Sequence, residues 1–124
     1  MADEITVSVL LKMAKGQIEL KREVRNYTLD MAGDAYDAEV VTATTAANGI
    51  ALSIATAVGT GGYAWFRNLD STNFVEIGVL ESGTFAPTVK LKAGEFCLFR
   101  LATDAIYIKG DTASCLLEYI VIED

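Results

Sequence analysis

Alternation of apolar and polar residues with a period of two constrains the fold of this chain more than any other sequence feature. Near the N-terminus, one side of an extended segment is entirely apolar: Ile5, Val7, Val9, Leu11 and Met13. A strand with one face toward apolar surroundings and one toward water has this pattern. The first segment is therefore predicted to be a strand that ends near Gly16.

The second segment carries Ile18, Leu20 and Val24 on one face, between acidic and basic residues of alternating sign. This arrangement favours a second strand. A short amphipathic helix over residues 17–27 is the alternative.

Turn-forming residues divide the rest of the chain into short β-prone runs. Asn48-Gly49 separates runs at 40–44 and 50–54, and this dipeptide is a strong hairpin signal. Further breaks follow every eight to twelve residues, which gives about nine or ten short strands and no convincing helix. The predicted fold is all-β: a single-domain antiparallel β-sandwich (jelly-roll-like) or barrel over residues 1–124.

The last apolar run, residues 116–122, is apolar on both faces apart from Glu118. Such a strand lies centrally in a sheet, or packs one face on another subunit. The mean hydropathy of +0.32 is high for a small soluble domain. We therefore expect part of the apolar surface to be covered by copies of the chain or by another protein.

Charge and composition exclude several classes of partner. The net charge is −7 and the basic residues form no run, so nucleic acid is not a predicted partner. No apolar run is long enough to span a bilayer, and the segment Met1–Glu4 is acidic where a signal peptide is basic. Neither membrane insertion nor secretion by a signal peptide is predicted.

The chain contains no histidine, which removes the commonest general base and the commonest metal ligand. Cys97 and Cys115 have no CxxC spacing and no histidine partners, so a zinc site is not predicted. Each lies inside an apolar segment and is expected to be a small buried hydrophobe, with a single disulfide left open. The glycines of residues 59–62 lack the Gly-Lys-Ser/Thr ending of a phosphate-binding loop. No enzyme activity, metal or cofactor is predicted.

Carboxylates are the remaining candidates for chemistry. A paired-carboxylate hydrolase would draw on acids that lie mainly in predicted turns: Asp30, Asp34, Asp37, Asp70, Glu76 and Glu81. The first three are also candidate calcium ligands, but their spacing does not match a DxDxDG loop. Solvated or turn-capping carboxylates are the preferred interpretation.

Tyr63, Trp65 and Arg67 share one side of a predicted strand and form a candidate interaction face. Aromatic residues with arginine are enriched at interface hot spots, and aromatic platforms also suit sugar rings. The preferred interpretation, however, places Tyr63 and Trp65 in the core and pairs Arg67 with a nearby acid such as Glu76.

Several stretches of strand and turn are similar to small virion structural proteins of tailed bacteriophages. They are residues 34–37, 62–70, 73–78, 91–101 and 117–124. The similarity covers most of the chain from about residue 29 onward and includes no catalytic signature.

The resemblance implies a virion component assembled in the cytoplasm of a bacterial host. The first expectation is a capsid decoration (cement) protein, a β-rich homotrimer that stabilises the head by bridging major capsid proteins. The alternative is a tail- or fibre-associated domain that binds a receptor or glycan through Tyr63, Trp65 and nearby loops. The implied partners are copies of the chain itself and the major capsid protein or another virion protein.

Overall fold

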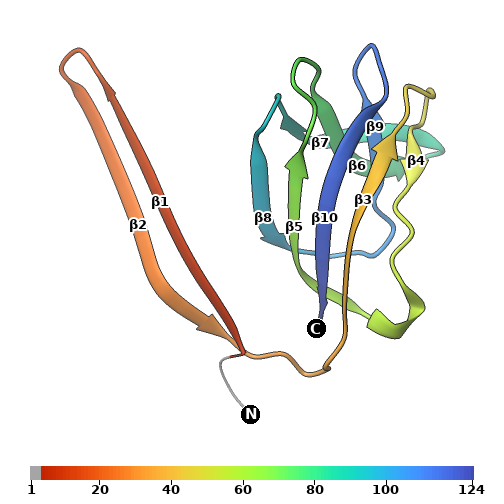
Figure 1. The fold of residues 1–124 in the computed structure, drawn as a ribbon, viewed down its shortest axis with the longest axis horizontal. Helices are drawn as coiled ribbons and strands as arrows, with labels where there is room; N and C mark the ends of the chain where they lie inside the picture. The colour runs from red at the N-terminus through yellow and green to blue at the C-terminus, as the bar shows by residue number, and fades with distance from the viewer. Residues whose placement is uncertain (1–3) are drawn as a thin grey trace. The chain divides into compact units, whose positions relative to one another are not determined.

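The computed structural model describes residues 4–124, which form two compact units, residues 4–32 and 33–124. Within the described residues there are ten strands and one short 3-10 helix (Figure 1). Their bounds are β1 Ile5–Lys15, β2 Ile18–Leu29, β3 Tyr36–Ala43, β4 Ile50–Ala51, η1 Thr56–Val58, β5 Gly61–Asn68, β6 Val75–Glu81, β7 Thr84–Leu91, β8 Phe96–Arg100, β9 Tyr107–Gly110 and β10 Cys115–Glu123.

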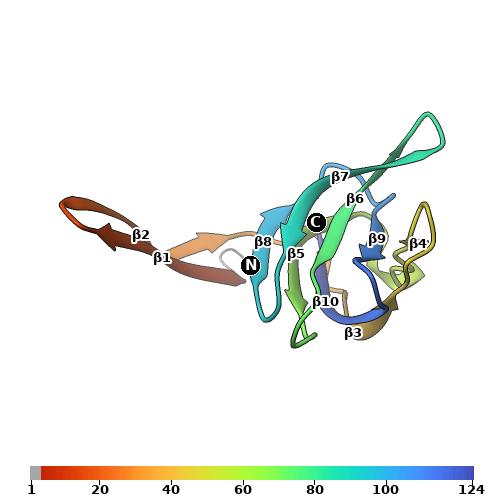
Figure 2. The same ribbon diagram turned by 90° about the horizontal axis from the view of Figure 1, so that it is seen from above.

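The second unit is a sandwich of two four-stranded antiparallel sheets, ordered β3-β10-β5-β8 and β4-β9-β6-β7 (Figures 1 and 2). Successive strands repeatedly cross from one sheet to the other, and this strand order is that of an eight-stranded jelly roll. The all-β prediction is confirmed, and the two separate sheets select a sandwich over a barrel. The sandwich begins at residue 33, however, because β1 and β2 pair only with each other.

The core lies between the two sheets, where alternate residues of each strand point inward. Its largest fully buried side chains are Tyr119, Phe66, Ile77, Ile108 and Leu117. At the turn after β5, the buried Asn68 side chain donates hydrogen bonds to two carbonyl oxygens, of Asn73 (2.8 Å) and Leu91 (3.0 Å). A buried amide with both donors satisfied ties this turn to β7.

The prediction that the last strand is central is confirmed, because β10 lies between β3 and β5. The hairpin predicted at Asn48-Gly49 is wrong. A turn with Gly49 at φ 65 does form there, but β3 pairs with β10 and β4 pairs with β9. The Asn48 side chain bonds the β6–β7 turn instead, at the Gly83 carbonyl and the Phe85 amide.

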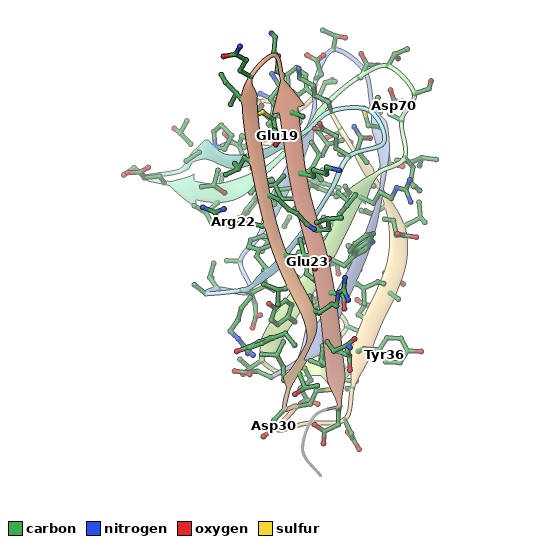
Figure 3. All side chains as sticks on the ribbon, turned by 90° about the vertical axis from the view of Figure 1, so that its left-hand side faces the viewer. Glu19, Arg22, Glu23, Asp30, Tyr36 and Asp70 are labelled. Atoms are coloured by element: carbon green, nitrogen blue, oxygen red, sulfur yellow. The ribbon has the colours of Figure 1, made fainter. Side chains whose placement is uncertain are left out.

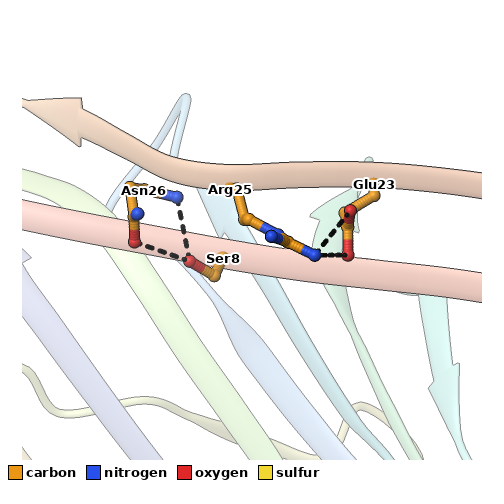
Figure 4. Close-up of polar contacts among 4 residues, drawn as sticks. All are labelled: Ser8, Glu23, Arg25 and Asn26. Atoms are coloured by element: carbon orange, nitrogen blue, oxygen red, sulfur yellow. Dashed lines mark hydrogen bonds and ion pairs between the residues drawn. The ribbon is translucent and has the colours of Figure 1, made fainter.

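The first unit is an N-terminal hairpin of β1 and β2, so strand rather than helix forms over most of residues 17–27. Gly16, at φ 60, opens its two-residue turn, as a type II′ turn requires. Between Val7 and Val9 the register shifts, with Asn26 at φ 50 in the bulge. There the Ser8 hydroxyl accepts a hydrogen bond from the Asn26 amide at 2.9 Å (Figure 4).

Candidate interaction faces

The sheet β3-β10-β5-β8 has an outward side, here called the outer sheet face, that is largely apolar. Cross-strand register places the following residues on it: Tyr36, Ala38, Val40 and Thr42 of β3; Leu116, Glu118, Ile120 and Ile122 of β10; Tyr63, Trp65 and Arg67 of β5; Phe96, Leu98 and Arg100 of β8. Tyr36 is 69% exposed and projects from the start of β3 (Figure 3), and Phe96 is 61% exposed. A sandwich sheet that faces water usually carries polar residues on this side.

The three residues singled out in the sequence, Tyr63, Trp65 and Arg67, all lie on the outer sheet face, between β10 and β8. The core receives Ala64 and Phe66 from the same strand, so the core interpretation of Tyr63 and Trp65 is wrong. The cross-strand neighbours of Arg67 are Glu118 and Phe96, whereas Glu76 belongs to the other sheet. The suggested pairing of Arg67 with Glu76 is therefore wrong.

Trp65 is held in place by two contacts within the outer sheet face. Its ring stacks on Phe96 at a centroid distance of 5.1 Å, and its indole N–H donates to Glu118 Oε1 at 2.8 Å. Nearby, the Arg100 guanidinium lies 5.5 Å from the Tyr63 ring and pairs with Asp124 at 2.7 Å. These contacts fix the aromatic side chains, so little rotamer entropy remains to be lost when a partner covers them.

A hollow of about 290 Å³ opens near the small residue Ala38. On the outer sheet face its lining includes Val40, Glu118 and Ile120. A hollow of this kind suits an inserted side chain from a partner surface.

The N-terminal hairpin presents a second apolar surface, here called the hairpin apolar face. Cross-strand pairing brings together Ile5, Val7, Val9, Leu11, Met13, Ile18, Leu20, Val24, Tyr27 and Leu29. Leu11, for example, is 57% exposed. Arg22 and Lys15 are the charged residues within this face, while Glu23, adjacent to Arg22 along β2, lies on the opposite face (Figure 3).

The candidate carboxylates do not form a metal site in the part of the chain that the structure describes. Within residues 4–124, no three His, Cys, Asp or Glu side chains are placed to hold a metal ion. Asp70 caps its own turn, accepting from the amides of Thr72 (2.9 Å) and Asn73 (2.6 Å), and these hydrogen bonds lower its pKa. Glu76 and Glu81 lie on β6, in the sheet away from the outer sheet face.

Asp37, one of these candidates, belongs to a polar cluster that sequence reasoning missed. The Tyr119 hydroxyl lies 3.0 Å from Asp37 Oδ2, 2.8 Å from Glu39 Oε2 and 3.0 Å from the Ser53 carbonyl. Burial and the two carboxylates raise the pKa of Tyr119. Asp37 also accepts from the Ala55 amide at 2.8 Å, so the cluster ties β3 and β10 to the segment before η1.

Cys97 and Cys115 are both free thiols. Cys115 is buried, as expected, whereas Cys97 is partly buried and packs against the core. Burial raises the pKa of Cys97 to about 11 and also raises the pKa of Cys115. Both are poor nucleophiles in this environment.

Sequence reasoning identified three residues of the outer sheet face and missed most of the others. The available signal was apolarity on both sides of a strand, as in Phe96 and Leu98 against Cys97 and Phe99. That pattern was noted only for the last strand. It marks a strand with two apolar faces without saying which of them lies in the core.

Comparison with protein-family models, curated proteins and solved structures finds no match to this chain. Within residues 4–124, no helix is long and apolar enough to cross a membrane.

Proposed function

We propose that this protein is a structural component of a tailed-phage virion, and specifically a capsid decoration (cement) protein that stabilises the head by bridging major capsid proteins. The observation that carries the proposal is the outer sheet face: a broad apolar surface with fixed aromatic side chains on a rigid sandwich. Such a surface binds through buried area, and many symmetric copies multiply weak contacts into high avidity.

The resemblance of residues 62–70 and 91–101 to virion structural proteins supports the same role, and those ranges contain all but the first residue of β5 and the whole of β8. The fold is compatible with it but does not select it, because jelly rolls occur in viral capsid proteins and in lectins.

Glycan recognition at the tail is the weaker candidate. Sugar-binding platforms combine an open aromatic ring with polar groups for the hydroxyls. Here the Trp65 ring is stacked on Phe96 and its N–H is engaged by Glu118, which favours a protein partner.

The test is binding of the purified full chain to DNA-free heads of the phage that encodes it, by co-sedimentation and cryo-EM. We expect density on the outer capsid surface, and heads that withstand osmotic shock better than undecorated heads. Trp65→Ala should weaken binding, and Leu69→Ala, in the loop after β5, is the control. Density confined to the tail, or glycan-array binding that Trp65→Ala abolishes, would replace this proposal with the receptor-binding one.

A further inference from the structure

Each chain carries one hairpin apolar face and one outer sheet face, and both are exposed sheet surfaces made of alternate residues. We propose that the hairpin apolar face of one copy docks on the outer sheet face of a second copy, over β3 and β10. This inference goes beyond the virion role and does not depend on it.

Both faces are built of apolar side chains that are about half exposed. Leu11 (57%) and Ile18 (63%) belong to the hairpin apolar face, and Val40 (55%) and Leu116 (52%) belong to the outer sheet face. Contiguous exposed apolar surface of this kind marks a site of association with another protein surface.

The two faces are compatible in size and shape. β1 has 11 residues and β10 has 9, which correspond to about 37 Å and about 30 Å of extended strand. Two sheet faces pack about 10 Å apart with interdigitated side chains. The hollow beside Ala38 is the place on β3 and β10 where a leucine-sized side chain of the hairpin fits.

The charges of the hairpin apolar face and of the β3–β10 part of the outer sheet face are also complementary, whereas Arg67 and Arg100 of the outer sheet face lie on β5 and β8. The charged members of the hairpin apolar face, Arg22 and Lys15, are both basic. Over β3 and β10 the charged member of the outer sheet face is Glu118. Opposite charges within otherwise apolar faces favour one register of docking over others.

Association with further copies of the chain can cover both surfaces at once. Pairing of two hairpin apolar faces would leave the outer sheet face uncovered in every copy. Docking of hairpin on sheet uses one surface of each kind per copy, so a closed ring or a reciprocal dimer covers the hairpin apolar face and the β3–β10 part of the outer sheet face. The β5–β8 part, which carries Trp65, stays uncovered and available for a capsid partner.

The first experiment measures the mass of full-length variants by light scattering and sedimentation at micromolar concentration. Leu11→Glu should weaken self-association at least about 100-fold, because it places a charged carboxylate among apolar side chains and engages its cross-strand partner Arg22, which then no longer pairs with Glu118 of the second copy. Leu10→Glu is the matched control, since Leu10 is 55% exposed on the opposite face of the same strand. On the sheet, Val40→Glu should act as Leu11→Glu does, with Leu69→Glu as its control.

The second experiment mixes the two disrupted variants. Leu11→Glu retains an intact outer sheet face and Val40→Glu retains an intact hairpin, so the mixture should form a complex that neither variant forms alone. Circular dichroism of each variant checks that the sandwich is folded.

Three results would overturn the inference: a monomeric wild-type chain, self-association of Val40→Glu at wild-type strength, or no complex in the mixture. The first indicates a hairpin that covers its own chain, and the second indicates pairing between hairpins. None of them bears on head binding, which is measured separately on the phage particle.

Discussion

The N-terminal hairpin and the sandwich are built from the same period-two pattern but differ in what covers their apolar sides. In the sandwich, two sheets bury each other's inner faces, and residues such as Phe66 and Leu117 are 0% exposed. The described residues of the hairpin unit form a single two-stranded layer, in which Val9 is 50% exposed. The comparison shows that apolar alternation predicts an apolar face, but not whether another layer covers that face.

The difference also affects how each region is stabilised. The sandwich holds a continuous core, whereas a two-stranded hairpin alone in water is marginally stable. The order of the hairpin therefore depends more strongly on a partner surface. The predictions below test this contrast.

The largest expected effect compares two leucines. Leu117→Ala, in the core, should lower the free energy of unfolding by about 2–5 kcal/mol, because it leaves a cavity between the sheets. Leu10→Ala, on the charged side of the hairpin, should change it by less than about 0.5 kcal/mol. Urea unfolding followed by Trp65 fluorescence measures both. Equal losses would show that the two regions do not differ as described.

The next largest effect is a difference in thiol reactivity between the sandwich and the hairpin. At pH 8, a thiol with a pKa of about 11 holds about 100-fold less thiolate than one at the ordinary value of 9.0. Cys97 should thus react with Ellman's reagent about 100-fold more slowly than a cysteine placed on the hairpin by Leu10→Cys. Unfolding in urea should equalise the rates. Fast labelling of Cys97 in the folded wild type would contradict its burial.

A smaller effect concerns the dependence of stability on pH. The pKa of Asp70 is lowered in the folded state, so its ionised form adds stability above the unfolded value of 3.8. That contribution is lost as the pH falls below 3.8 and through the folded pKa. Asp70→Ala should therefore be less stable than wild type at neutral pH, with the difference shrinking below pH 3.8. A difference that is constant with pH would contradict the assignment.

The smallest effect lies in the hairpin bulge. Ser8→Ala removes the acceptor of the Asn26 amide, at an expected cost of about 0.5 kcal/mol because water replaces the hydroxyl at this exposed site. Hydrogen exchange at the Asn26 amide should become about twofold faster. Thr6→Ala, two residues earlier on the same face of β1, is the control and should leave that amide unchanged.

The sequence contained enough information for the strand content and for part of the candidate site. Tyr63, Trp65 and Arg67 were placed on one face because strand periodicity is local. Tyr36 and Ile120 were not joined to them, because their proximity depends on β10 pairing with both β3 and β5. The Tyr119 cluster was missed for the same reason, since its members come from residues 37 to 119.

The sequence by itself determined an all-β chain of about ten strands, because alternation and turn residues act over a few neighbouring positions. It did not determine that the sandwich begins at residue 33, or that the strands flanking Asn48-Gly49 belong to different sheets. Only the tertiary structure decided these points. Strand pairing joins residues far apart in the chain, and a period of two defines two faces without specifying which layer covers each.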